Sequence, residues 1–236
     1  MRCGISTACF YPDTTLNSLA QVIETGVPVT EVFLNTFHEY EDDYIAKLVE
    51  MVSSSGIRVK SFHPFSSMIE GFLFASDYQG RFDDGLQLYR RFFKAAAALG
   101  AELMVCHGDH AYNVANCPAE EYARRFCAVA RVGREYGVTL CHENVSYCRL
   151  AQPEEVRELR PLLGDMAAFV LDTKQAKRHG VPVEEMLDAM GSDLRHVHIS
   201  DYSANHNCIP PGQGNMDYQD FFARLQRIGY AGDIVL

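Results

Sequence analysis

The sequence has no Cys-x-x-Cys pair, although it contains 8 cysteines. Pairs at that spacing are the usual mark of a zinc knuckle or a thiol redox motif, so neither is indicated. Several of the cysteines, such as Cys106 and Cys141, lie inside apolar runs. This pattern favours reduced core cysteines in a cytoplasmic protein over a disulfide framework.

Basic residues are also scarce, with 21 Lys and Arg against 31 Asp and Glu, for a formal net charge of −10. Nucleic-acid binding depends on clustered Lys and Arg, so we expect no nucleic-acid partner. The chain has neither a secretory apolar region nor an apolar stretch near the ~20 residues of a membrane span. The Gly-x-Ser-x-Gly elbow of serine hydrolases is absent as well. The composition therefore suits an enzyme of small, mostly uncharged molecules.

The hydrophobic period alternates along the chain between strand and helix. Strand-like runs cover residues 2–6, 31–35, 57–63, 102–107, 138–143, 167–172, 194–199 and 233–236. Helical patterns cover residues 16–25, 42–54, 81–99, 119–136, 153–163, 183–190 and 218–228. This order predicts an α/β fold, a single (β/α)8 TIM barrel over residues 1–236 that lacks its last helix. A doubly wound sheet is the alternative.

Three strand-like runs carry an acid or an imidazole at the carboxyl end: Glu143, Asp172 and His198. Side chains alternate along a strand, and in a parallel barrel the chemistry gathers at the carboxyl ends of the strands. We therefore expect these three side chains to converge. Two carboxylates and one imidazole are a suitable ligand set for a divalent metal ion.

The same rule places three other strand-end side chains at the carboxyl-end opening of the barrel, its mouth: Asn35, His63 and His107. By alternation His142 faces outward into the helix layer, as a packing or surface residue. His196 faces inward one layer below His198, where a hydrogen-bonded core imidazole is favoured over a metal ligand.

Markers in this order resemble the xylose isomerase-like barrel superfamily, which holds sugar isomerases and epimerases, inosose dehydratases and abasic-site DNA endonucleases. The markers are His63-Pro64, His107-Gly108, Glu143-Asn144, Asp172, His198-Ile-Ser-Asp201 and Gly212-Gln-Gly214. In the epimerase branch a glutamate of strand five, an aspartate of strand six, a histidine of strand seven and a glutamate of strand eight hold the metal. Glu143, Asp172 and His198 match the first three, and the resemblance makes Glu143 the candidate general base.

The chain also departs from the family pattern. Where the family has a histidine three residues after the strand-six aspartate, this chain has Gln175, a poor metal ligand that suits substrate contact. Lys174 beside it is interpreted as a solvated loop residue, with stabilisation of an anionic intermediate as the alternative. The endonuclease branch needs an Asp-x-His pair where this chain has His206 and Cys208, so a three-metal nuclease centre has no support.

These observations predict a metal-dependent isomerase or epimerase of a keto sugar, cyclitol or related polyol. The implied mechanism is proton abstraction beside a carbonyl through a metal-stabilised cis-enediolate, with one Mn²⁺, Zn²⁺ or Mg²⁺ ion. His63, His107, Gln175 and Asn35 would contact the substrate. Three alternatives stay open: an inosose dehydratase, an endonuclease-like phosphodiesterase, and a non-catalytic sugar-binding barrel.

Two further expectations concern the surroundings of the site. Aromatic-rich segments at 10–12 and 62–74 would line the mouth, and they suit a sugar site or a subunit contact of a homo-oligomer equally. The family's fourth ligand lies at the tip of strand eight, where this sequence stops at Leu236. We therefore expect the natural chain to run further.

Overall fold

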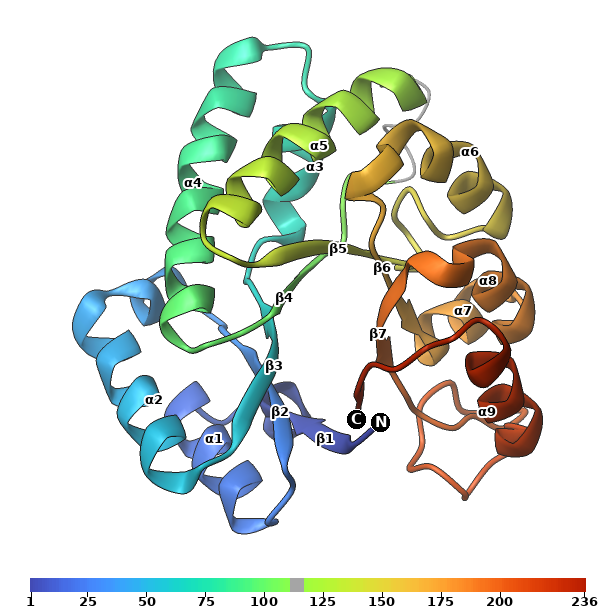
Figure 1. Cartoon of the computed structure of the whole chain (residues 1–236), viewed down its shortest axis with the longest axis horizontal. Coiled ribbons are helices and arrows are strands. Elements are labelled where there is room, and N and C mark those ends of the chain that lie inside the picture. Colours follow the sequence, from blue (N-terminus) through green and yellow to red (C-terminus); the bar gives the residue numbers. More distant parts are fainter. Residues whose placement is uncertain (111–116) are drawn as a thin grey trace.

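The computed structural model describes residues 1–110 and 117–236, and its centre is a closed barrel of eight parallel strands. The strands follow one another around the barrel in chain order, and β1 closes it by pairing with both β2 and β8. Figure 1 looks into the barrel, with the helices arranged around the strands. The closed ring confirms the expected TIM barrel and excludes the doubly wound sheet.

The elements follow the expected order closely. The strands are β1 (Cys3–Ser6), β2 (Val29–Phe33), β3 (Arg58–His63), β4 (Leu103–Cys106), β5 (Thr139–Glu143), β6 (Phe169–Asp172), β7 (Leu194–His198) and β8 (Ile234–Val235). The α-helices are α1 (Thr15–Glu24), α2 (Asp42–Ser55), α3 (Ser67–Ala75), α4 (Gln79–Ala98), α5 (Ala119–Glu135), α6 (Pro153–Leu163), α7 (Thr173–His179), α8 (Val183–Met190) and α9 (Tyr218–Arg227). Short 3-10 turns are η1 (Thr7–Phe10), η2 (Phe37–Tyr40), η4 (Gly164–Met166) and η5 (Gly191–Asp193).

Two short helices were not expected from the sequence. Helix α3 occupies most of the segment interpreted as an aromatic loop, and α7 occupies the segment that carries Lys174. Helix α7 has only seven residues, and the sequence of α3 is apolar at most of its positions, so neither displays a clear apolar period and their end signals matter more than their pattern. In α7 those signals are the Asp172 side chain, which caps the first turn, and Gly180 at φ 78°, which ends the last one.

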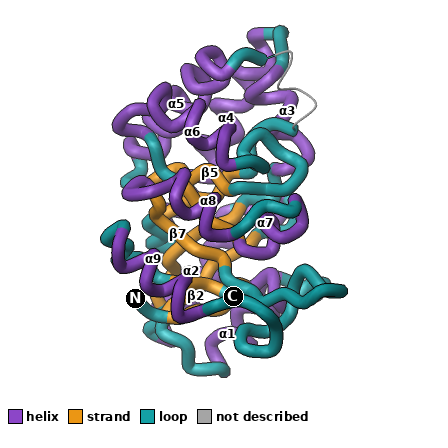
Figure 2. Tube along the Cα trace, turned by 90° about the vertical axis from the view of Figure 1, so that its right-hand side faces the viewer, coloured by secondary structure: helices purple, strands orange, loops and turns teal. Residues whose placement is uncertain are grey.

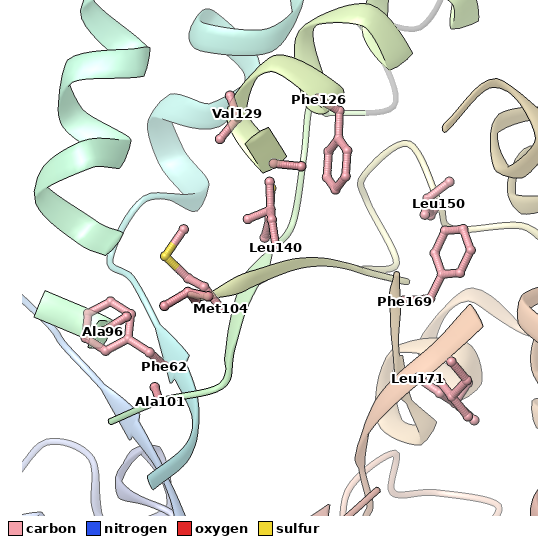
Figure 3. Close-up of a cluster of buried hydrophobic side chains, with 14 of the residues drawn as sticks. Phe62, Ala96, Ala101, Met104, Phe126, Val129, Leu140, Leu150, Phe169 and Leu171 are labelled. Atoms are coloured by element: carbon pink, nitrogen blue, oxygen red, sulfur yellow. The ribbon is translucent and has the colours of Figure 1, made fainter. Parts of the chain in front are cut away.

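The core has two parts separated by the barrel wall. A small cluster fills the barrel interior and consists of Leu103, Val105, Cys141, Ala168 and Val170. The larger cluster lies between the strands and the helices, and Figure 3 shows part of it, from Phe62 and Met104 to Phe169 and Leu171. Figure 2 shows the strands from the side, surrounded by helices, with the longer loops projecting to the right of the view.

Among the residues that the structure describes, none of the helices combines the length and the apolar character needed to cross a bilayer.

His142 belongs to the shell between barrel and helices, as strand alternation predicts. Its Nε2 accepts the hydroxyl of Tyr122 at 2.7 Å, and its ring stacks on Phe126. Burial lowers the pKa of His142 to about 3, because the charged form would lose its hydration there.

This lowered pKa predicts an acid-sensitive fold. Between pH 6.5 and 3 the unfolded chain binds a proton at residue 142 that the folded chain does not bind, so the free energy of unfolding falls as the pH falls. At pH 5 the loss from this group is about 2 kcal/mol. We expect the His142→Asn protein, measured by urea unfolding at pH 7, 6 and 5, to lose less stability on acidification than the wild type. An equal loss in the two proteins would contradict the assignment.

Candidate metal centre at the barrel mouth

A cavity of about 330 Å³ opens at the carboxyl ends of the strands, and three carboxylates line it. They are Glu31 of β2, Glu143 of β5 and Asp172 of β6, all of them buried. Lining the same cavity are three imidazoles, those of His63, His107 and His198. Charged groups at this density need partners, because an isolated buried charge is unfavourable by several kcal/mol.

Glu143 is the last residue of β5, and each of its oxygens meets an imidazole. Oε1 lies 2.8 Å from Nδ1 of His198, and Oε2 lies 3.0 Å from Nε2 of His107. Burial alone would raise the pKa of Glu143, but the hydrogen bonds from His107 and His198 lower it well below its usual value. The carboxylate is therefore ionised at neutral pH.

Asp172 ends β6 and at the same time caps α7. Its Oδ1 accepts the backbone N–H of Gln175 at 2.9 Å, while Oδ2 lies 3.5 Å from Nζ of Lys174 and 4.0 Å from Nδ1 of His198. Burial raises the pKa of Asp172, against the lowering effect of Lys174. One oxygen thus secures the side chain to its own helix, and the other is directed to the cavity.

His198, the last residue of β7, lies between two carboxylates. Its Nδ1 is 2.8 Å from Oε1 of Glu143, and its Nε2 is 2.9 Å from Oε2 of Glu31. Ionised carboxylates only accept hydrogen bonds, so both ring nitrogens carry a proton in this arrangement. Burial opposes the charged ring, but the two carboxylates outweigh it and raise the pKa of His198 well above its usual value.

Glu31 is a site residue that the sequence analysis missed. The second strand was expected at residues 31–35, whereas β2 spans Val29–Phe33, so Glu31 lies in its middle with its side chain in the cavity. The sequence does contain an indication that Glu31 has partners, because a glutamate inside an apolar, strand-like run is rarely buried without one. The hydroxyls of Ser6 and Ser61 donate to its carboxylate at 3.1 and 2.7 Å.

His63 and His107 form a pair beside Glu143, with their Nε2 atoms 2.9 Å apart. Burial lowers the pKa of His63 to about 4, whereas Glu143 raises the pKa of His107 in spite of the burial of that ring. Nδ1 of His63 donates to the carbonyl of Pro64 at 3.2 Å, so Nε2 of this neutral ring carries no proton. Nε2–H of His107 thus donates to Glu143 and lies within hydrogen-bond distance of the bare Nε2 of His63.

Asn144 connects the two strand ends that carry the carboxylates. Its Oδ1 accepts the backbone N–H of Asp172 at 2.7 Å, and its Nδ2 donates to the carbonyl of the same residue at 3.1 Å. The Asn144 side chain therefore fixes the tip of β5, with Glu143, against the tip of β6.

The remaining expected site residues are divided between the cavity and its surroundings. Gln175 lines the cavity, and its Oε1 accepts the backbone N–H of Ser146 at 3.3 Å. Lys174 lines it too, as a residue of α7 and not of a loop. Asn35 follows β2 by two residues, and its Nδ2 donates to Thr15 at 3.1 Å, outside the residues that line the cavity.

The donor set around Nδ1 of His198 fits a divalent ion. Glu143, Asp172 and His198 each offer one ligand atom, and these atoms lie within 4.8 Å of one another. Two ligands about 2.1 Å from a shared ion lie at most about 4.2 Å apart, so small shifts bring all three into range. Within the described part of the chain, two other groupings meet the same distance limit: Glu31 with His196 and His198, and His63 with His107 and Glu143.

Comparisons with known proteins agree with this architecture. The family model of the xylose isomerase-like TIM barrel matches residues 19–236. No curated protein matches the chain. The solved structures that share the fold include a D-tagatose 3-epimerase-like protein, at 19% sequence identity and a TM-score of 0.78, with 100% of this chain and 90% of that chain covered.

Two further structures share the fold at the same low level of sequence identity. D-psicose 3-epimerase with D-tagatose, from Clostridium cellulolyticum H10, is 18% identical with a TM-score of 0.79, covering 100% of this chain and 84% of that one. The IOLI protein with a binding zinc atom is 18% identical with a TM-score of 0.80, covering 100% of this chain and 88% of that one.

The hydrogen bonds of Asn144 generate a testable prediction. Asn144→Ala leaves the buried backbone N–H of Asp172 without its acceptor and removes one donor to its carbonyl, and an unsatisfied buried group costs about 1–3 kcal/mol. We expect a decrease of that size in the free energy of unfolding, measured by urea denaturation. The matched change Asn205→Ala, at an exposed loop position, should leave stability nearly unchanged. Equal effects of the two substitutions would contradict the role of Asn144.

Proposed function

The chain belongs to the xylose isomerase-like TIM barrel family, and we propose that it is a divalent metal-dependent isomerase or epimerase of a keto sugar, cyclitol or related polyol. The observation that carries the proposal is the convergence of Glu143, Asp172 and His198 in one buried cavity at the carboxyl ends of the strands. Active sites of this barrel type occur at that end.

The three residues would hold the ion through two carboxylate oxygens and one imidazole nitrogen. A mixed oxygen and nitrogen set suits Mn²⁺, Zn²⁺ or Mg²⁺. A bound ion supplies positive charge that stabilises the negative charge developing on substrate oxygens.

Glu143 is the proposed general base. Its lowered pKa keeps the carboxylate ionised, and its position in the cavity wall brings it beside a bound substrate. The carboxylate would take the proton from the carbon next to the substrate carbonyl, which leaves a cis-enediolate. Return of a proton to the same carbon or its neighbour completes an epimerisation or an isomerisation.

The histidine pair has a complementary part in this proposal. His107, with its raised pKa, is the donor to a substrate oxygen, and His63, with its pKa lowered to about 4, is the neutral acceptor for a substrate hydroxyl. Neighbouring groups whose pKa values are displaced in opposite directions are typical of acid and base partners. Lys174 and Gln175 border the same space and would orient the remaining hydroxyls.

The experiment that tests the function is solvent-deuterium exchange. Metal-free protein and protein loaded with Mn²⁺, Zn²⁺ or Mg²⁺ are incubated in D₂O with a panel of ketoses and inososes, and products are examined by NMR. We expect metal-dependent deuterium at the carbon beside the carbonyl. Loss of water from an inosose would identify a dehydratase instead, and binding without exchange would identify a sugar-binding barrel. Cleavage of abasic-site DNA would overturn the proposal in favour of a phosphodiesterase.

Substitution of the proposed base gives a sharper prediction. Glu143→Gln removes a group that accepts a proton and holds the cation, so we expect exchange to fall by about 10²–10⁴-fold or more. The same change at Glu154, on the exposed face of α6, is the control and should leave the exchange rate unaltered. Retention of wild-type exchange in a folded Glu143→Gln protein would exclude Glu143 as the base.

A further inference from the structure

We propose that Glu31 is the positioning residue of the metal centre: it binds the Nε2–H of His198 and so makes Nδ1 the atom that ligates the metal. This inference rests on the proposed metal site and adds to it a third carboxyl-bearing strand, β2. Glu31 itself would not touch the ion.

Three donors occupy the carboxylate of Glu31. Ser6 donates to Oε1 at 3.1 Å, and Ser61 donates to Oε2 at 2.7 Å. Nε2 of His198 lies 2.9 Å from Oε2 as well. The carboxylate is buried at 3% exposure. Its lone pairs are engaged by side chains of three other strands, which makes it a fixed acceptor in the barrel interior.

Deeper in the barrel, the donor and the acceptor of each hydrogen bond that leads to Glu31 can be assigned. Ser61 gives its only proton to Glu31, so its oxygen must accept from Nε2 of His196 at 3.0 Å. His196 then carries its proton on Nε2, which leaves Nδ1 bare. Among the described residues, Nδ1 of His196 has no hydrogen-bond partner, in agreement with this assignment. The chain of donors therefore runs from His196 through Ser61 to Glu31.

The opposite side of the His198 ring faces the proposed ligands. Nδ1 lies 2.8 Å from Oε1 of Glu143 and 4.0 Å from Oδ2 of Asp172. With Nε2–H held by Glu31, Nδ1 is the nitrogen that would give up its proton when a metal ion binds, and its lone pair would then face an ion held by these two carboxylates. The alternative grouping of Glu31, His196 and His198 would require breaking the bonds from Ser61 and His196.

A carboxylate behind a ligating imidazole fixes its tautomer and ring orientation and makes it a better donor to the metal. Loss of such a partner typically lowers metal affinity by about 10–100-fold. Glu31→Gln keeps the size of the side chain but removes its charge, so the same decrease is expected here.

The first arm of the test is isothermal titration of Zn²⁺ into metal-free wild-type, Glu31→Gln and Glu102→Gln proteins, with circular dichroism as a check on folding. Glu102 is half-exposed and lies outside the residues that line the cavity. We expect about 10–100-fold weaker binding for Glu31→Gln and wild-type affinity for Glu102→Gln. Unchanged affinity in a folded Glu31→Gln protein would overturn the proposal, and so would complete loss of the site, which would make Glu31 a ligand.

The second arm needs no variant and decides the matter if Glu31→Gln fails to fold. In Zn²⁺-loaded wild-type protein labelled with ¹⁵N-histidine, long-range ¹H–¹⁵N correlations report which ring nitrogen carries the proton. We expect His198 with a protonated Nε2 and a metal-bound Nδ1; a metal-bound Nε2 would overturn the proposal. Proton exchange into ketoses alongside a metal-bound Nε2 would defeat this inference alone, whereas absence of Zn²⁺ binding to wild-type protein would defeat the proposed function.

Discussion

The position of His198 between Glu31 and Glu143 is the interaction on which the site depends. One imidazole ring neutralises part of the charge of two buried carboxylates, at 2.9 and 2.8 Å, and thereby allows three carboxylates to share one cavity. Without such compensation, buried carboxylates would take up protons or destabilise the fold. The same contacts orient the ring, so the charge balance that stabilises the cavity also fixes the imidazole that we propose as a metal ligand.

The closed barrel makes this arrangement possible because it brings residues distant in sequence to one rim. Glu31, Glu143, Asp172 and His198 come from four strands, and parallel pairing places all their carboxyl ends on the same side. Asn144 adds a lateral constraint between β5 and β6, and Asp172 joins its strand to the helix that follows. The site is thus fixed by backbone contacts as well as by its charges, which favours a preorganised centre over one assembled on binding.

The features of the fold and the site that depend on a single strand or helix could be predicted from the sequence. Strand alternation is a rule that applies within one strand, and it correctly directed Glu143 and Asp172 to the cavity and His142 to the helix layer. Glu31 was missed because its strand begins two residues earlier than expected, which obscured a buried glutamate in mid-strand. Helix α7, and with it the setting of Lys174, was missed because seven residues carry too weak an apolar period to outweigh the polar composition. The donors of Glu31 come from β1, β3 and β7, and no single-strand rule predicts such a contact.

The proposed function requires that Glu143, Asp172 and Nδ1 of His198 surround one divalent ion. Crystals grown with Mn²⁺ test it directly, because anomalous scattering locates the metal independently of any assumed ligand. We expect one peak roughly 2.0–2.3 Å from a carboxylate oxygen of each acid and from Nδ1 of His198, with Glu31 still bonded to Nε2 of that ring. A peak ligated by Glu31, or one centred on His63 and His107 without Asp172, would contradict it.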